Sequence, residues 1–139
     1  MTKLEDCLIF LIGKAQQQAY QTSKALLQPY GITPVQSALL LLLFEVDGQH
    51  SSELGERIRL DSATMTGLLD RLMKQGLIER RSSEKDRRIN HIYLTDRGKE
   101  LQTTLEHKII EINEAILRHF SDEEAEQLKK MLIKIGLKK

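Results

Sequence analysis

Hydrophobic residues recur every three or four positions over several stretches of the chain, a spacing that predicts helices with one buried face. The first stretch covers residues 4–27 and is expected to end near Pro29 to Gly31. A second helix should begin at Thr33 to Gln36, which combine an N-cap, a first-turn proline and a capping-box glutamine. The run Ala38 to Phe44 is apolar on every side, so this helix should lie at the centre of the fold and end at Asp47-Gly48. The apolar stripe of the first stretch consists of Leu4, Leu8, Leu11, Ile12, Ala15 and Ala19.

Two short helices are expected next, in close succession. Ser51 or Ser52 can cap the first, and the pair Asp61-Ser62 offers an N-cap for the second. The second should stop at Gly76, where a residue with a left-handed backbone is favoured. Its buried face is expected to contain Met65, Leu68, Leu69, Leu72 and Met73.

The pattern changes after Gly76 and predicts a β-hairpin followed by two helices. Residues 77–81 and 89–94 favour strands, and the polar residues 82–88 between them form a charged tip. Thr95 should cap a long helix, and Ser121 to Glu124 form the capping box of a last one. We expect the last helix to bury Leu128, Met131, Leu132 and Ile135. The chain is thus predicted to be mainly α with a small β-hairpin wing (α+β), a winged helix-turn-helix between N- and C-terminal helices.

Composition is that of one globular domain. The chain has 139 residues, of which 40% are hydrophobic and 29% charged, enough for a core without disulfides or metals. The single cysteine, Cys7, cannot form an internal disulfide, and the N-terminus lacks signal-peptide features, so a reducing cytoplasm is the expected location. The longest apolar run, Ala38 to Phe44, is far shorter than the roughly 20 residues of a membrane-spanning helix.

Charge is distributed unevenly, although the net charge is only +1. Residues 57–99 contain eleven Lys or Arg and six Asp or Glu, a local charge of +5, and the remainder of the chain carries −4. A concentrated basic segment is expected where a protein contacts phosphate, but a solvated, charge-rich surface would give the same count. Because these charges lie on a predicted helix-turn-helix, we favour the interpretation that they contact nucleic acid.

The second helix of a helix-turn-helix places its N-terminal part in the major groove, which favours short polar side chains there. Ser62, Thr64 and Thr66 fit this requirement. Ser62 also suits a phosphate contact at the helix N-terminus, or it is a plain N-cap. Arg71 and Lys74 suit phosphate contacts that hold the register, unless they are solvated surface residues.

Arginines dominate the predicted wing. Because a guanidinium is planar and always charged, it can enter an A·T-rich minor groove, and we assign this contact to Arg88, with Arg81 and Arg87 also on the DNA side. A neighbouring carboxylate can brace the turn by pairing with a strand arginine, which is the role expected of Asp86. The same residues in an isolated turn would simply be solvated.

Other chemistry is not indicated. His50, His91, His107 and His119 lack the spacing of a metal site, so no metal and no cofactor are expected. Cys7 is either a small core residue or a redox sensor. Because the chain has no glycine-rich phosphate loop and no nucleophile elbow, we do not expect an enzyme.

Several motifs follow one another along the chain: Gly31 to Thr33 with Gln36, Leu60 to Thr66, Leu69 to Leu72, Gly76 to Arg80, Asp86 to Arg88, and Leu94 to Gly98. In order and spacing they resemble those of the multiple-antibiotic-resistance regulators, the MarR family. The resemblance implies one domain of residues 1–139, in which 33–98 bind DNA and 1–30 with 100–139 clasp a homodimer. It also implies a regulator, commonly a repressor, that binds a pseudo-palindromic operator and responds to a small aromatic or phenolic anion.

The resemblance also places an effector crevice between the dimerisation and DNA-binding parts. The crevice would draw on Ile12, Gln16, Gln36, Leu40, Phe44 and His91. In the family's peroxide-sensing branch the reactive cysteine would fall at Ile9, and its two tyrosines at Gly13 and Ser23, so that arrangement is not expected here. The alternative function is a winged-helix module that binds a protein partner, which would require an apolar patch where this chain has a basic one.

Overall fold

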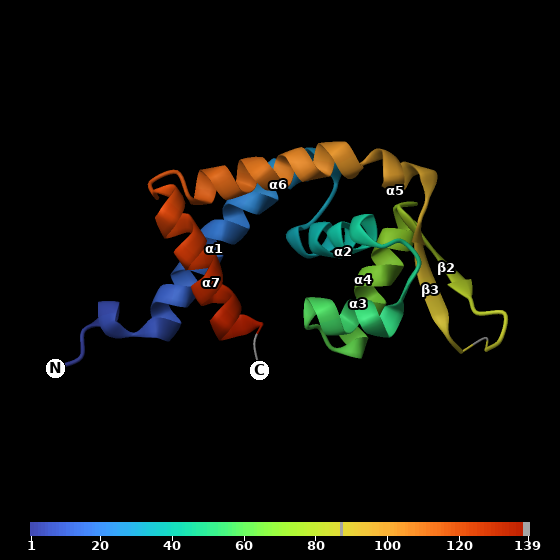
Figure 1. The fold of residues 1–139 in the computed structure, drawn as a ribbon, viewed down its shortest axis with the longest axis horizontal. Helices are drawn as coiled ribbons and strands as arrows, with labels where there is room; N and C mark the ends of the chain where they lie inside the picture. Colours follow the sequence, from blue (N-terminus) through green and yellow to red (C-terminus); the bar gives the residue numbers. More distant parts are fainter. Residues whose placement is uncertain (87, 138–139) are drawn as a thin grey trace.

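The computed structural model describes residues 1–86 and 88–137 and contains the predicted elements in the predicted order (Figure 1). Helices α1, α6 and α7 form one side of the molecule, and α2, α3, α4 and a small sheet form the other, with α6 running across the top. The elements are η1 (Leu4–Asp6), α1 (Leu8–Leu27), η2 (Gln28–Tyr30), α2 (Pro34–Glu45), β1 (Gln49–His50), α3 (Ser51–Ile58), α4 (Ser62–Lys74), β2 (Ile78–Ser82), β3 (Asn90–Leu94), α5 (Asp96–Glu100), α6 (Gln102–Ile116) and α7 (Asp122–Gly136).

Helix α2 is the centre of the core, as its apolar run predicted. Leu39, Leu40 and Leu43 are fully buried there, and α2 packs against α1, α3 and α6. The predicted capping box is present, because the Gln36 amide donates to Thr33 Oγ1 at 3.3 Å and the Thr33 amide donates to Gln36 Oε1 at 3.0 Å. The helix therefore begins where the sequence indicated.

The end of α2 differs from the prediction by two residues. The helix ends at Glu45 rather than at Asp47-Gly48, because Val46 has an extended backbone. The side chain of Gln49 folds back on this end, where its Nε2 atom donates to the carbonyl oxygens of Leu42, at 2.7 Å, and Val46, at 2.6 Å. Since the Leu42 carbonyl also accepts the Val46 amide at 3.2 Å, Gln49 replaces the donor of a further helical turn at Val46 alone.

Three other helix boundaries also differ from the predictions. The first helix is interrupted at Cys7, whose extended backbone separates η1 from α1. The long helix after Thr95 is divided at Leu101, whose amide donates to the carbonyl of Gly98 in a tightened turn. The cap of α3 is His50, not a serine: its Nδ1 accepts the Ser52 amide at 3.0 Å. An imidazole acceptor replaces the expected hydroxyl.

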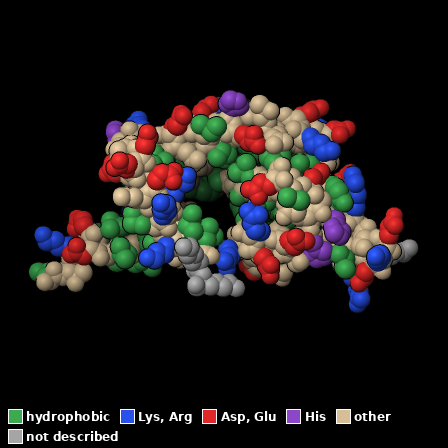
Figure 2. Space-filling view, viewed as in Figure 1, with side chains coloured by type: hydrophobic (Ala, Val, Ile, Leu, Met, Phe, Trp, Pro, Cys, Tyr) green, Lys and Arg blue, Asp and Glu red, His purple; other side chains and the backbone are tan. Residues whose placement is uncertain are grey.

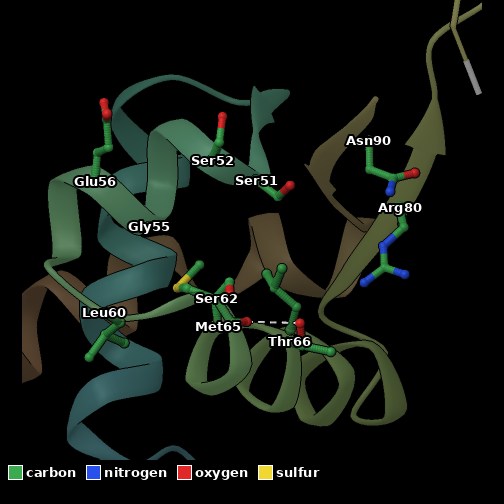
Figure 3. Close-up of a pocket in the computed structure, with 11 residues that line it drawn as sticks. Ser51, Ser52, Gly55, Glu56, Leu60, Ser62, Met65, Thr66, Arg80 and Asn90 are labelled. Carbon is green, nitrogen blue, oxygen red and sulfur yellow. Dashed lines mark hydrogen bonds between the residues drawn. The ribbon is translucent and has the colours of Figure 1, made fainter. Parts of the chain in front are cut away.

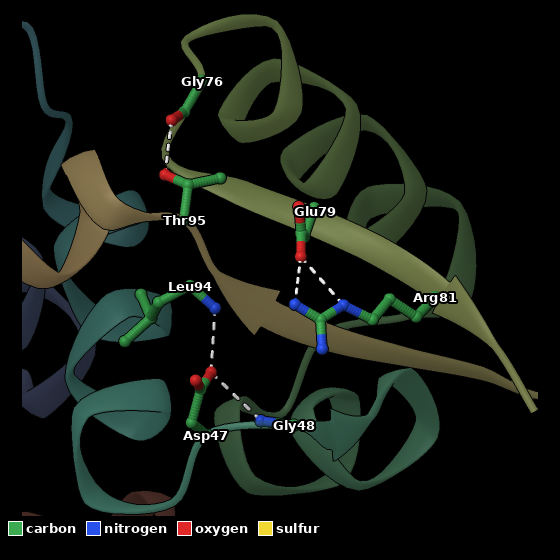
Figure 4. Close-up of polar contacts among 7 residues, drawn as sticks. All are labelled: Asp47, Gly48, Gly76, Glu79, Arg81, Leu94 and Thr95. Atoms are coloured by element: carbon green, nitrogen blue, oxygen red, sulfur yellow. Dashed lines mark hydrogen bonds and ion pairs between the residues drawn. The ribbon is translucent and has the colours of Figure 1, made fainter.

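The sheet has three antiparallel strands in the order β1-β3-β2. Strands β2 and β3 are the predicted hairpin, with Ile78 opposite Leu94, whereas the two-residue strand β1 is too short for a periodic signal. Asp47 fastens the sheet to the end of α2, because its Oδ1 accepts the amides of Leu94, at 2.8 Å, and Gly48, at 3.1 Å (Figure 4). The wing therefore has a fixed base.

Apolar side chains predicted to be buried on α1 and α7 are exposed in the single chain. Leu8 and Ile135 are 70% and 65% exposed, and no residue of α7, which lies wholly in the described part of the chain, is buried. Figure 2 shows hydrophobic side chains gathered over the lower part of α1. The prediction that α7 buries its apolar stripe was therefore wrong for the single chain, because no element among residues 1–86 and 88–137 covers it. The exposed stripe residues are Leu4, Leu8, Leu11, Ile12, Met131, Leu132 and Ile135.

The length and apolarity that a membrane crossing requires are not combined in any one helix of the described residues. Only a pair bent by 70°, Leu8–Tyr30 with Pro34–Glu45, meets those requirements jointly, by length and composition.

Candidate nucleic-acid interface

Asp61 fixes the start of α4. Its Oδ1 accepts the Thr64 amide at 2.8 Å, and its Oδ2 accepts the Thr64 hydroxyl at 2.9 Å. The backbone bond from Thr64 and then the hydroxyl bond lower the pKa of the Asp61 carboxyl. Ser62 is the first residue of the helix, so the interpretation of Ser62 as its N-cap was wrong. The serine hydroxyl is left for other contacts.

The three side chains predicted to read bases lie exposed on the first turns of α4. The Thr66 hydroxyl donates to the carbonyl of Ser62 at 2.9 Å, and the Thr64 hydroxyl donates to Asp61. Because both protons are occupied, the two threonines offer an acceptor lone pair and a methyl group to a base edge. The opposite face of the helix is buried through Met65, Leu68, Leu69 and Leu72.

The last turn of α4 presents two exposed cations. Arg71 and Lys74 lie there, and Gly76 follows with φ +74°, the left-handed conformation that the sequence predicted at the helix end. Cations near the negative end of the helix dipole are stabilising, so Arg71 and Lys74 also favour the helix itself.

A groove of about 540 Å³ lies between α3, α4 and the hairpin (Figure 3). Hydroxyls of Ser51, Ser62 and Thr66 line it together with Arg80 and Asn90. Arg80 reaches from β2 toward α4, where its Nη2 lies 3.9 Å from Asp70 Oδ1. Arg80 was not among the predicted contacts, although strand alternation places it on the opposite face from Arg81. The groove extends the polar surface of α4 onto the wing.

Arg81 is held on the outer face of the wing. Its Nε donates to Glu79 Oε1 at 2.8 Å, and its Nη2 contacts the same oxygen (Figure 4). Its guanidinium also lies 4.1 Å from the centre of the Tyr93 ring. The hydrogen bond that Arg81 donates to Glu79 is the main cause that raises the pKa of Arg81. A DNA contact of Arg81 must therefore compete with an existing partner.

Arg88 is highly exposed at the tip of the wing, with 91% of its side chain accessible. Its Nε and Nη2 donate to the two oxygens of Asp86, at 3.1 and 3.2 Å, and its amide donates to Asp86 Oδ1 at 3.0 Å. These hydrogen bonds lower the pKa of the Asp86 carboxyl. Asp86 thus pairs with the tip residue Arg88 itself rather than with a strand arginine. The predicted contact Arg87 lies outside the described residues.

The six residues of the predicted effector crevice are spread over α1, α2 and the wing, and five depressions lined by residues of the described ranges 1–86 and 88–137 include none of them. Gln36 and Leu40 are 4% and 0% exposed within α2, and His91 sits at the wing, where its Nδ1 lies 3.1 Å from the carbonyl of Gly48. Ile12 and Gln16 are exposed on α1, and Phe44 is partly buried.

No cluster of three or more His, Cys, Asp or Glu side chains able to hold a metal occurs within residues 1–86 and 88–137. His50 and His91 do lie close together, with ring centres 5.7 Å apart in an edge-to-face arrangement. Their Nδ1 atoms are occupied by the Ser52 amide and the Gly48 carbonyl, respectively, so the pair links α3 to β3.

Removing the Asp61 cap is expected to lower stability in a pH-dependent way. Because folding lowers the pKa of Asp61, its carboxylate stabilises the fold above the unfolded pKa of about 3.9, and that contribution is lost as the pH falls through the folded pKa. The urea midpoint of Asp61→Ala should therefore lie below that of the wild type at pH 7, by a margin that shrinks in acid. Asp61→Asn retains an acceptor and should keep most of the stability without this pH dependence. A margin for Asp61→Ala that is constant with pH would contradict the cap.

Comparison with known proteins places this chain in a family. Residues 32–89 match the family model described as MarR family. The chain is 38% identical, over 132 residues, to the organic hydroperoxide resistance transcriptional regulator of Bacillus subtilis, an alignment that covers 94% of this chain and 87% of the relative.

Solved structures share the whole architecture. A probable transcriptional regulator from Pseudomonas aeruginosa superimposes with a TM-score of 0.90 at 29% identity, covering 96% of this chain and 99% of the other. A mutant MarR from E. coli complexed with operator DNA gives 0.83 at 23% identity, covering 91% of each chain. The winged-helix fold is thereby confirmed, and the family is not an enzyme family, as expected. The match in sequence and in fold over nearly the full length establishes that this chain belongs to the MarR family of DNA-binding transcriptional regulators.

Proposed function

We propose that the protein is a homodimeric, ligand-responsive repressor that binds a pseudo-palindromic operator through α4, here called the recognition helix, and the wing of residues 81–89. The observation that carries the proposal is the combination of small exposed polar side chains at the start of α4 with an exposed arginine at the wing tip. The first suits the major groove and the second the minor groove. Residues 33–98 are the DNA-binding region in this proposal.

Individual contacts follow from the geometry. Ser62, Thr64 and Thr66 would meet base edges, and Arg71 and Lys74 would bind phosphates on either side of the groove. Arg88 would enter the adjacent minor groove, with Asp86 limiting the conformations of its guanidinium before binding. The pairing of Arg81 with Glu79 suits it to a rim contact rather than a deep one.

A second copy of the chain is the occupant proposed for the apolar faces of α1 and α7. Side chains such as Ile9 and Ile135, 81% and 65% exposed, would form a patch unusual on a monomer. Residues 1–30 and 100–139 would clasp the partner, and the two-fold axis would place two recognition helices about 34 Å apart on one face of the DNA.

A small aromatic or phenolic anion is the proposed effector. Figure 2 shows the molecule hollowed below α6, between α1 and α2, with hydrophobic side chains around the hollow. Ile12 and Gln16 are exposed on α1 and Phe44 is partly buried on α2, whereas Gln36 and Leu40 are buried within α2. In this proposal the first three would contact the effector, and Gln36 and Leu40 would lie behind them. A partner chain would close the hollow into a crevice.

The proposal is tested by titrating the purified protein against duplex DNA recovered by selection from a randomised pool, at two salt concentrations and with unrelated DNA as competitor. We expect one dimer per palindrome and an affinity that falls steeply with salt, because Lys and Arg displace counterions. Equal binding to unrelated DNA, or a monomer in sedimentation, would contradict the proposal. The alternative, a winged-helix module that binds a protein partner, would then be favoured.

A further inference from the structure

Two glutamine side chains connect the end of the recognition helix to the start of α2. Gln36 Nε2 donates to Gln75 Oε1 at 3.0 Å, and Gln75 Nε2 donates to the carbonyl oxygen of Gly31 at 2.7 Å. Gln36 is only 4% exposed, whereas Gln75 is partly exposed, so the bond between them is partly buried. Buried polar groups of this kind are costly to leave unpaired.

The direction of these hydrogen bonds is fixed by the backbone at both ends. The Thr33 amide can only donate, so the Gln36 atom 3.0 Å from it must be Oε1. Gln36 Nε2 then faces Gln75, whose Oε1 accepts, and this leaves Gln75 Nε2 to donate to Gly31. Position 75 therefore needs one acceptor and one donor on the same planar group, which a neutral amide supplies.

Gln75 stands at a junction between the proposed dimerisation helices and the recognition helix. Gly31 closes η2, directly after α1, and Gln75 is the C-cap residue of α4. The carbonyl of Gln75 accepts from Arg97 Nη1 of α5 at 3.0 Å, and the next carbonyl, of Gly76, accepts from Thr95 Oγ1 at 2.6 Å (Figure 4). The end of α4 is thus held from the α1–α2 side and from the α5–α6 side.

We propose that Gln75 is a positioning residue for operator recognition: its side chain sets the orientation of the recognition helix relative to α1 and α2, and it determines specificity without contacting DNA. This inference rests on the proposed DNA-binding function. Base readout depends on the helix axis, since a bidentate or methyl contact requires correct placement in the groove. Phosphate attraction tolerates small rotations because it is a longer-range charge interaction.

The first test is the neutral variant Gln75→Leu, which removes both hydrogen bonds and retains a similar volume. We expect its affinity for the selected operator to fall about tenfold, because the two hydrogen bonds that stabilise one orientation of the recognition helix are lost. Its affinity for unrelated DNA, and the slope of affinity against salt, should remain those of the wild type, because no phosphate contact is lost. Global unfolding would instead reduce both affinities equally.

The second test is Gln75→Glu, measured relative to the wild type at pH 7.5 and pH 5.0. The ionised carboxylate accepts from Gln36 but cannot donate to Gly31, so specificity should fall at pH 7.5. Protonation restores the donor, and the contact with the Gly31 carbonyl oxygen favours the protonated form, whereas the guanidinium of Arg97, 3.0 Å from the carbonyl oxygen of residue 75, favours the ionised form. Specificity should therefore be higher at pH 5.0 than at pH 7.5. The control Gln28→Glu adds the same charge near Gly31, at a side chain without a hydrogen bond in the described part of the chain, and should keep wild-type specificity at both values.

The outcomes separate the two proposals. A wild-type protein that does not distinguish the selected sequence from unrelated DNA would refute the proposed function, and this inference with it. If the wild type discriminates, unchanged specificity in Gln75→Leu, or equal losses on both DNAs, would refute the positioning role alone. A specificity of Gln75→Glu that stays low at pH 5.0 would refute the donor bond to Gly31 as its cause.

Discussion

Replacement of Gly98 by alanine is expected to destabilise the protein by about 3 kcal/mol or more, near the upper end of the range for overpacking a core. Gly98 is buried in α5, and a Cβ atom there would collide with the carbonyl oxygen of Leu77 and lie 3.2 Å from Leu94 Cδ2. The Leu77 oxygen also accepts the amide of Thr95 at 3.1 Å, so it cannot move away without breaking the link between the wing and α5. Urea unfolding at fixed protein concentration measures the effect.

A matched control is available in the same chain. Gly13 lies exposed within α1, and a Cβ atom there would meet no described atom within 4 Å. Gly13→Ala should stabilise α1 by up to about 1 kcal/mol, because alanine favours the helix more than glycine does. If Gly98→Ala unfolds at the same urea concentration as the wild type, the close approach of α5 to Leu77 is wrong.

Local sequence signals correctly predicted the starts of α2, α5 and α7, because the residues that cap a helix are its immediate neighbours. The capping boxes Thr33–Gln36 and Ser121–Glu124 and the left-handed Gly76 are all present. The break at Leu101 and the early end of α2 were missed since they depend on backbone and side-chain bonds that no periodic pattern encodes. Strand β1 was missed because two residues have no periodicity.

The exposed apolar stripes of α1 and α7 show what hydrophobic periodicity does not predict. Periodicity correctly identified which residues share an apolar face, but it cannot distinguish burial within one chain from burial against another. Leu8 and Leu132, for example, belong to these apolar faces and yet are exposed in the single chain. Under the proposed dimer the same pattern is explained by the partner.

At the candidate interface, sequence placed residues on the right elements but could not reveal how they pair. Arg81 is engaged by Glu79 and Tyr93 on one face of the hairpin, whereas Arg80 points to the other face, toward Asp70. The hydroxyl protons of Thr64 and Thr66 are occupied locally, which narrows what those side chains can offer to a base. Such pairings depend on rotamers and on register.

Arg88→Ala is expected to produce the largest loss of DNA affinity among single substitutions. An arginine that enters a groove contributes about 1–3 kcal/mol, roughly ten- to hundredfold in affinity, and a dimer would lose two such contacts. The slope of log affinity against log salt should also decrease by about 0.9 for each phosphate-neutralising charge removed. Anisotropy titrations with the selected operator at several salt concentrations measure both quantities.

The controls separate a wing contact from a general charge effect. Arg118→Ala removes the same charge from an exposed position at the end of α6 and should leave affinity nearly unchanged. Asp86→Ala retains the guanidinium but removes the two hydrogen bonds that restrict it, so its loss should be smaller than that of Arg88→Ala. Wild-type affinity in Arg88→Ala would show that the wing tip does not bind the operator. A larger loss in Asp86→Ala would instead assign the carboxylate to folding the tip, through its bond from the Arg88 amide.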